Sequence, residues 1–296
     1  MNAVGPGLSK ALFHAAGAAY AGPLQLALAD GIKYALASSD SIITLAGPAG
    51  CGKTVSLLNA ISQFGTESTV ARISRVYLKR EDVLEALLDE FNVEQKPTST
   101  VQRFNILKEL LKNRAEPDSQ ILIVVEDAER LGVEALAELE SLTAADEGET
   151  PGAHLVLMGP SNLKALLSHP DLVRLQQRVR RRLILEPFSI EETRSYLNHC
   201  LQEAGGDIDD LFSKDAVQIV YECAGGLARA INTVSESMLF AASAETLEQV
   251  SAEFARAIAR RDFDFEEAGN VIDESMDAPN SSVDGDSHAI GRSLNE

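Results

Sequence analysis

Short apolar runs alternate with amphipathic segments along the first two thirds of the chain. Five runs have the length and composition of buried strands: residues 41–47, 70–78, 121–125, 153–159 and 182–185. Helical spacing of apolar residues predicts helices over residues 24–37, 53–64, 81–91, 101–114, 132–142, 162–167 and 171–179. Strands that alternate with helices in this way indicate an α/β fold, with a parallel sheet covered on both faces.

The pattern changes at Pro187, after which no further strand is predicted. Apolar faces recur at helical spacing over residues 190–204, 213–223, 227–243 and 247–262. Ser189 and Glu192 have the spacing of a capping box at the start of the first of these helices. We therefore expect a small, all-helical second domain.

Charge adds a third region to this organisation. The formal net charge is −19, and residues 262–296 contain ten acidic residues and one basic residue. No apolar periodicity continues there, which is typical of a disordered tail that either keeps the chain soluble or docks on a basic partner. The expected domains are a loose arm (1–18), an α/β core (19–186), a helical domain (187–262) and an acidic tail (263–296).

Cysteine usage and hydropathy indicate a location. The three cysteines are scattered, which does not suit a disulfide framework and fits a reducing compartment. No segment approaches the roughly 20 apolar residues that cross a bilayer, and we identify no signal peptide. We expect a cytoplasmic protein without direct membrane insertion, peripheral to the inner membrane only through a partner.

Residues 47–54, GPAGCGKT, match the phosphate-binding loop G-x-x-x-x-G-K-[ST] between a predicted strand and a predicted helix. Glycines let the backbone N–H groups surround phosphates, and the helix start adds partial positive charge. In this motif Lys53 contacts the β- and γ-phosphates of a nucleotide, and Thr54 offers its hydroxyl to Mg²⁺. The motif predicts a nucleotide site.

A second motif, ILIVVED at residues 121–127, ends a buried strand with two adjacent carboxylates. In a parallel sheet that end lies at the same edge as the phosphate loop. One of Glu126 and Asp127 is therefore expected to hold a magnesium-bound water and the other to orient the attacking water.

Arginines concentrate in residues 174–183, RLQQRVRRRL, and three interpretations remain open for them. One arginine reaches the γ-phosphate bound by a neighbouring subunit, as an arginine finger. Alternatively, the cluster contacts nucleic-acid phosphates, or it pairs with the abundant Asp and Glu. A strongly acidic chain argues against general affinity for nucleic acid. A further arginine, Arg229, follows a Gly-Gly pair at a helix start, from where it can fold back onto the nucleotide.

Taken in order, these blocks resemble the AAA+ ATPases of the ExeA/GspA type, predicted secretion-pathway ATPases of bacteria. The related transposition regulators TniB and TnsC are also similar. The resemblance covers about residues 20–245 and is most specific in LEPFSIEETRSYLNHCLQEAG and FSKDAVQIVYECAGGLARAIN. It implies a Walker A motif at 47–54, a Walker B pair at Glu126 and Asp127, an arginine finger at Arg178 and a sensor-2 arginine at Arg229.

The resemblance also implies ATP and Mg²⁺ as cofactors and a nucleotide-dependent homo-oligomer, with a bacterial secretion or envelope protein as a possible partner. The residues assigned to the nucleotide are Gly47, Pro48, Ala49, Gly50, Cys51, Gly52, Lys53, Thr54, Val55 and Arg229. Thr54 and Glu126 are assigned to the metal, and Glu126, Asp127 and Arg178 to catalysis.

Three positions depart from the family pattern. The Walker B pair is usually Asp-Glu and is Glu-Asp here; Pro160 occupies the usual sensor-1 position; and Ala228 replaces the proline of the lid motif. Asp127 is one methylene short, and a misplacement of about 1 Å can cost on the order of 100-fold in rate. We therefore expect a slow ATPase that assembles or remodels a secretion or envelope complex. The alternatives are a DNA-associated adaptor and a nucleotide switch that does not hydrolyse ATP.

Overall fold

The computed structural model describes residues 20–36, 42–63, 68–74, 79–95, 97–114, 120–144 and 153–265. The predicted N-terminal arm and residues 266–296 of the predicted tail lie outside this part of the chain.

Within the described residues, five strands form one parallel sheet in the order β2-β3-β4-β1-β5. The strands are β1 (Ile42–Ala46), β2 (Ser68–Ile73), β3 (Gln120–Val125), β4 (His154–Gly159) and β5 (Val179–Ile184). This arrangement confirms the predicted α/β class. Because all strands run the same way, the ends of β1, β3 and β4 meet at one edge of the sheet.

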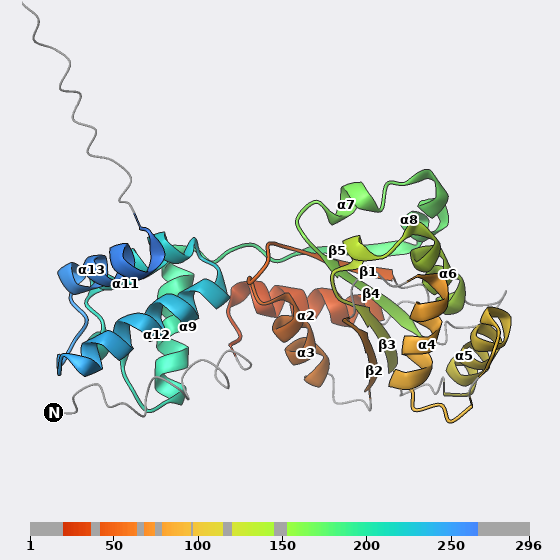
Figure 1. Ribbon diagram of the computed structural model, residues 1–296, viewed down its shortest axis with the longest axis horizontal. Coiled ribbons are helices and arrows are strands. Elements are labelled where there is room, and N and C mark those ends of the chain that lie inside the picture. Colours follow the sequence, from red (N-terminus) through yellow and green to blue (C-terminus); the bar gives the residue numbers. More distant parts are fainter. Residues whose placement is uncertain are drawn as a thin grey trace, which may run out of the picture. The chain divides into compact units, whose positions relative to one another are not determined.

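Helices cover both faces of the sheet, as Figure 1 shows. On one face, Ile121 and Ile123 pack with the apolar sides of α4 (Arg80–Glu90), α5 (Thr100–Arg114) and α6 (Val133–Thr143). On the other, Leu122 and Val124 pack with α2 (Pro23–Leu36) and α3 (Lys53–Ser62). Strand β3 is buried on both sides, which explains why its sequence is continuously apolar instead of alternating.

The segment that follows β4 differs from the prediction. It contains α7 (Leu163–Leu166), the 3₁₀ turn η3 (Pro170–Leu172) and α8 (Val173–Arg178), and β5 then begins at Val179 instead of residue 182. As an edge strand, β5 pairs its backbone with β1 and exposes every second side chain. Polar residues such as Arg180 and Arg182 are compatible with such a strand, so the apolar-run criterion finds only its second half.

Strand β2 also differs, because it runs from Ser68 to Ile73 and was predicted at 70–78. Residues 75–78 lie outside the described part of the chain.

The helices after Pro187 have an apolar core of their own, which includes Phe188, Leu197, Phe212 and Met238. They are α9 (Ile190–Glu203), α10 (Ile208–Leu211), α11 (Lys214–Ala224), α12 (Ala228–Ala244) and α13 (Ala252–Phe263). The capping box is confirmed: the Ser189 N–H donates to Glu192 Oε2 at 2.9 Å, and the Glu192 N–H to Ser189 Oγ at 3.2 Å. The short helix α10 was not predicted. We refer to residues 188–265 as the lid.

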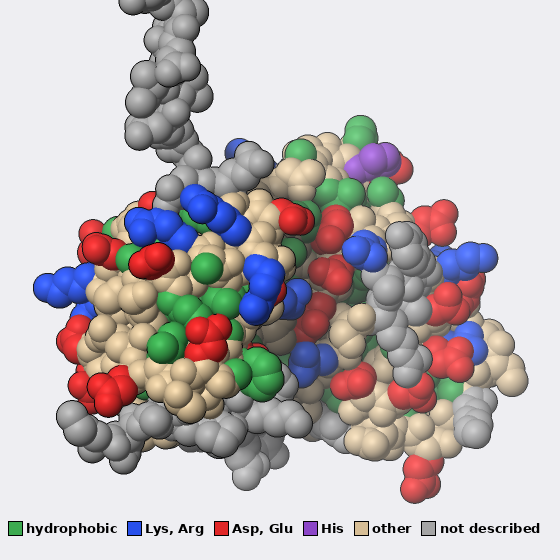
Figure 2. Space-filling view, turned by 60° about the vertical axis from the view of Figure 1, so that its left-hand side comes forward, with side chains coloured by type: hydrophobic (Ala, Val, Ile, Leu, Met, Phe, Trp, Pro, Cys, Tyr) green, Lys and Arg blue, Asp and Glu red, His purple; other side chains and the backbone are tan. Residues whose placement is uncertain are grey.

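Acidic and basic side chains intermingle on the face shown in Figure 2, including in the hollow beside the lid. Among the described helices, none has both the length and the apolar character needed to cross a bilayer.

Candidate functional site

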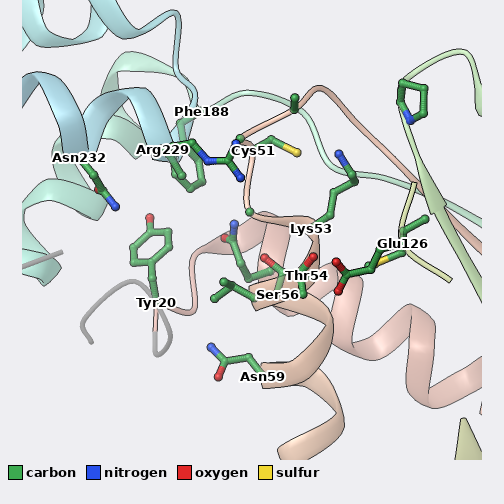
Figure 3. Close-up of a pocket in the computed structure, with 18 of the residues that line it drawn as sticks. Tyr20, Cys51, Lys53, Thr54, Ser56, Asn59, Glu126, Phe188, Arg229 and Asn232 are labelled. Carbon is green, nitrogen blue, oxygen red and sulfur yellow. The ribbon is translucent and has the colours of Figure 1, made fainter. Parts of the chain in front are cut away.

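A cavity of about 730 Å³ lies at the carboxyl edge of the sheet, next to the lid. The segment before α2, the phosphate loop with α3, the ends of β3 and β4, and lid helices α9 and α12 all contribute to its wall. Figure 3 shows that residues from these separate segments face a common space. Of the residues assigned to the nucleotide, all except Gly47 and Pro48 line this cavity.

Glycines determine the shape of the phosphate loop. Gly50 and Gly52 have φ angles of 82° and 94°, in the left-handed region that other residues rarely adopt. A Cβ on Gly47 would collide with the carbonyl oxygen of Leu185. The loop leads directly into α3, which begins at Lys53, so backbone N–H groups and the helix start face the same space.

Lys53 and Thr54 follow the loop and line the cavity. The Lys53 Nζ donates hydrogen bonds to the carbonyl oxygens of Gly47 at 2.8 Å and Pro48 at 3.0 Å. The charged amine is thus held at the loop, where it neutralises anionic ligands at little cost in side-chain entropy. Cys51 is almost fully buried, and burial raises the pKa of its thiol, which suits a packing role.

Glu126, the first carboxylate of the predicted Walker B pair, directly follows β3 and forms an ion pair. Its Oε1 accepts a hydrogen bond from Arg72 Nη2 on β2 at 2.6 Å. In Figure 3 the Glu126 carboxylate points toward Thr54. The hydroxyl and the carboxylate predicted to hold Mg²⁺ are therefore on the same side of the cavity, as that chemistry requires. Sequence reasoning did not identify Arg72, which is 54 positions away on a neighbouring strand and belongs to no motif.

The second Walker B carboxylate, Asp127, is exposed and has φ 50° and ψ 47°. It precedes the 3₁₀ turn η2 (Ala128–Arg130) and lines the cavity. Glu129, which follows within that turn, lines the cavity as well and was not predicted as a site residue. Pro160, directly after β4, lines the cavity, whereas the next two residues, Ser161 and Asn162, are not among the lining residues.

The lid contacts the phosphate loop through Arg229. The backbone N–H of Arg229 donates to the carbonyl oxygen of Gly50 at 3.0 Å, and its side chain lines the cavity. In Figure 3 the Arg229 guanidinium extends from the lid toward Cys51 and the loop. The Gly-Gly pair allows this approach because Gly226, at φ 71°, lies against the backbone of Phe188, where a Cβ would collide.

The end of the cavity away from Lys53 is aromatic and amide-rich, and the sequence motifs did not indicate it. The Tyr20 ring makes edge contacts with Phe188 and Tyr196, with centroid distances of 5.7 and 5.2 Å. Asn59 of α3 and Asn232 of α12 also face this space (Figure 3). Asn59 lies five residues beyond Thr54, and this spacing within α3 is the one local signal for this end of the cavity.

Arg178 lies outside the cavity of its own chain and is engaged with the end of α6. Its guanidinium donates to Glu140 Oε1 at 2.9 Å, to the Glu140 carbonyl at 2.7 Å and to the Thr143 carbonyl at 3.0 Å. The arginine and glutamate side chains are only 14% and 10% exposed. For Arg178, this contact agrees with the third interpretation, in which the arginines pair with Asp and Glu. Its role as an arginine finger remains a proposal.

The other arginines of the cluster do not form one surface. Arg180 and Arg182 are exposed on β5, while the Arg181 guanidinium lies 4.0 Å from the centroid of the Tyr34 ring on α2. Alternation along the strand sends neighbouring arginines to opposite faces.

Comparisons with known proteins agree with this architecture. Residues 36–167 match the family model described as "AAA domain". General secretion pathway protein A of Aeromonas hydrophila is 29% identical over 214 residues, which are 72% of this chain and 39% of that protein. The chain thus spans about two fifths of the length of this curated relative.

Solved structures with the same fold include the Cdc6p protein of Pyrobaculum aerophilum, with a TM-score of 0.66 and 19% identity over 84% of this chain and 70% of that one. The ORC2 protein of Aeropyrum pernix has a TM-score of 0.60 and 14% identity over 84% and 71% of the two chains. The RuvB Holliday junction branch migration motor of Thermotoga maritima has a TM-score of 0.52 and 15% identity over 80% of this chain and 69% of that one. Residues 36–167 of this P-loop core thus match an AAA domain, and the chain is similar to General secretion pathway protein A over 72% of its length.

Proposed function

We propose that this protein binds ATP with Mg²⁺ in the cavity between the phosphate loop and the lid, and hydrolyses it slowly. The observation that carries the proposal is that Lys53 with Thr54, Glu126 and Arg229, predicted from three separate places in the sequence, line one cavity. Two cations, a hydroxyl and a carboxylate are the groups needed for a triphosphate and its metal.

The two ends of the cavity fit the two ends of ATP. At the phosphate end, Thr54 and Glu126 would hold Mg²⁺, which neutralises charge on the phosphates when bound. At the other end, the Tyr20 and Phe188 rings and the Asn59 and Asn232 amides suit a nucleobase, which has an apolar face and a polar edge (Figure 3).

Slow turnover follows from the arrangement of the Walker B pair. Glu126 already has one oxygen committed to Arg72, and Asp127 is one methylene shorter than the usual glutamate. Both features weaken the positioning of the reacting groups, on which phosphoryl transfer depends.

We further propose that ATP drives self-association, in which Arg178 of one copy approaches the nucleotide of the next. Arg178 would then have to exchange its three hydrogen bonds to Glu140 and Thr143 for contacts with phosphate. This exchange makes association dependent on the charge of the bound nucleotide.

The resulting assembly would build or remodel a bacterial secretion or envelope complex from the cytoplasmic side, through a protein partner. The similarity to General secretion pathway protein A supports this role, although it covers 39% of that protein. DNA is the less favoured partner, because the arginine cluster is divided between a buried pair, a ring contact and an exposed strand edge. Basic side chains on the face in Figure 2 are interspersed with acidic ones.

The test compares the wild type with Lys53→Ala in three measurements: binding of a fluorescent non-hydrolysable ATP analogue, phosphate release, and particle mass by size exclusion with light scattering. We expect the wild type to bind the analogue, grow in mass with it and release phosphate slowly. Lys53→Ala should lose at least tenfold in affinity, because it removes a charge-assisted contact. A wild type that does not bind the analogue overturns the proposal; binding without phosphate release indicates the non-hydrolysing switch.

A further inference from the structure

We propose that Glu129, and not Asp127, is the carboxylate that orients and deprotonates the attacking water. The proposal rests on the ATPase function proposed above and names a catalytic residue outside the Walker B pair.

Glu129 is positioned by the turn that follows β3. Because η2 (Ala128–Arg130) curls back beneath the strand end, Glu129 lines the same cavity as Lys53 and Glu126. Its Oε1 lies 3.9 Å from Arg130 Nε. Its Oε2 is shielded from solvent and has no hydrogen-bond partner among the residues that the structure describes. Since Oε2 is packed at the end of β4 and the side chain as a whole is 28% exposed, Oε1 is the oxygen that would hold the water of the proposed step.

The neighbouring strand leaves space for this carboxylate. Gly159, the last residue of β4, has no side chain, and a Cβ there would lie 3.0 Å from Glu129 Oε2 and 2.9 Å from Leu163 Cδ1. Any other residue at 159 would require Glu129 or Leu163 to move. The glycine thus keeps the Glu129 carboxylate close to the end of β4.

No polar side chain from β4 competes for that position. The residues that line the cavity from β4 and its end are Met158 and Pro160, and neither side chain can donate or accept a strong hydrogen bond. Where a polar sensor residue would be expected, Glu129 therefore supplies the polar group.

Asp127 is less suited to the task. It is exposed, in a left-handed backbone conformation, and its side chain is one methylene shorter than that of Glu129. Electrostatic interactions with the reacting groups are stronger where water is excluded, which favours the shielded carboxylate.

In the proposed step, the oxygen of a water held by Glu129 forms a bond to the γ-phosphorus of ATP. The bond from that phosphorus to the oxygen bridging to the β-phosphate breaks, and ADP keeps the electron pair. The water proton passes to the Glu129 carboxylate and then to the phosphate product. A positioned general base typically contributes 10²–10⁴-fold.

The test compares matched amide variants, Glu129→Gln and Asp127→Asn, with Glu134→Gln as control, since Glu134 is an exposed carboxylate on α6 outside the cavity. We expect Glu129→Gln to lose about 100-fold in phosphate release at saturating ATP, and Asp127→Asn less than about tenfold. Affinity for the ATP analogue and the midpoint of thermal unfolding should stay within about twofold and about 2 °C of wild type in both. Added formate should partly restore Glu129→Ala and not Asp127→Ala, because it can replace a missing base.

The opposite ranking, with Asp127→Asn inactive and Glu129→Gln near wild type, overturns this assignment and leaves the proposed ATPase function standing. Loss of analogue binding or of thermal stability in Glu129→Gln also overturns it, since that result indicates a structural role. If the wild type itself releases no phosphate, the result overturns both the proposed ATPase function and the assignment of Glu129, so the two failures can be told apart.

Discussion

The α/β core contains two arginine–glutamate pairs of similar length in different surroundings. Arg178 and Glu140 lie 2.9 Å apart with side chains 14% and 10% exposed, and Arg178 also donates to two carbonyl oxygens. Arg72 and Glu126 lie 2.6 Å apart with side chains 41% and 21% exposed, beside the cavity. The distance between charges is therefore a poor guide to what a pair does.

Burial and the remaining partners separate the two pairs. The Arg178 charge is enclosed, so either partner left alone would be a nearly buried charge. The Arg72 pair is exposed enough for water to replace either partner at low cost. We conclude that the first pair holds α6 against α8, while the second can open at low cost and, in the proposed function, free Glu126 for the metal.

Replacing Arg178 should have the largest effect on stability. We expect Arg178→Ala to lower the free energy of unfolding by about 3–5 kcal/mol, because Glu140 and the Thr143 carbonyl lose their donor in a buried place. Urea unfolding measures this loss. Arg174→Ala, on the exposed side of the same helix, should stay within about 0.5 kcal/mol of wild type. A stable Arg178→Ala protein with reduced turnover would instead favour the finger role.

Acid should destabilise the protein through His154, at the start of β4. In contrast to the two pairs, this side chain is buried without an ionic partner among the described residues. Burial lowers the pKa of His154 from 6.5 to about 4, and its Nδ1 has no hydrogen-bond partner within the described residues. Between these values the unfolded chain binds more protons than the folded one, so stability falls as pH decreases from about 6.5 to about 4. The loss from this residue should approach about 3 kcal/mol.

This loss is isolated by comparing urea unfolding of the wild type and His154→Gln at pH 7 and pH 4.5, because Gln cannot titrate. The variant should show a smaller decrease than wild type over this range. His169→Gln, at an exposed histidine, should keep the wild-type decrease. Equal decreases in wild type and His154→Gln would show that His154 is protonated in the folded protein.

Replacing Arg72 should have the smallest effect on stability and a measurable one on metal use. Arg72→Gln should change the unfolding free energy by less than about 1 kcal/mol, as exposed pairs do. Since it removes a cation beside the predicted magnesium ligand, the Mg²⁺ concentration for half-maximal phosphate release should decrease about threefold. If this Mg²⁺ concentration increases instead, Arg72 orients Glu126 and does not compete with the metal.

The local motifs were well predicted because their chemistry is contained in short segments. The phosphate loop needs glycines at fixed positions, and β3 needs a continuous apolar run, so both can be recognised without a structure. The aromatic, amide-rich end of the cavity could not be predicted, since Tyr20, Phe188 and Asn232 come from three distant segments. The same holds for Arg72 and Glu140, whose partners are determined by strand order and helix packing. Glu129 belongs to no local motif, and only the turn η2 brings it to the cavity.

The hydrogen bond from the Arg229 N–H to the Gly50 carbonyl has a consequence for how the lid and the loop can evolve. Every residue type except proline supplies that N–H, so the connection between the two parts persists while side chains at position 229 drift. Divergent relatives can thus lose the arginine side chain and still keep the lid hydrogen-bonded to the loop. The backbone connection would then outlast any role of the side chain.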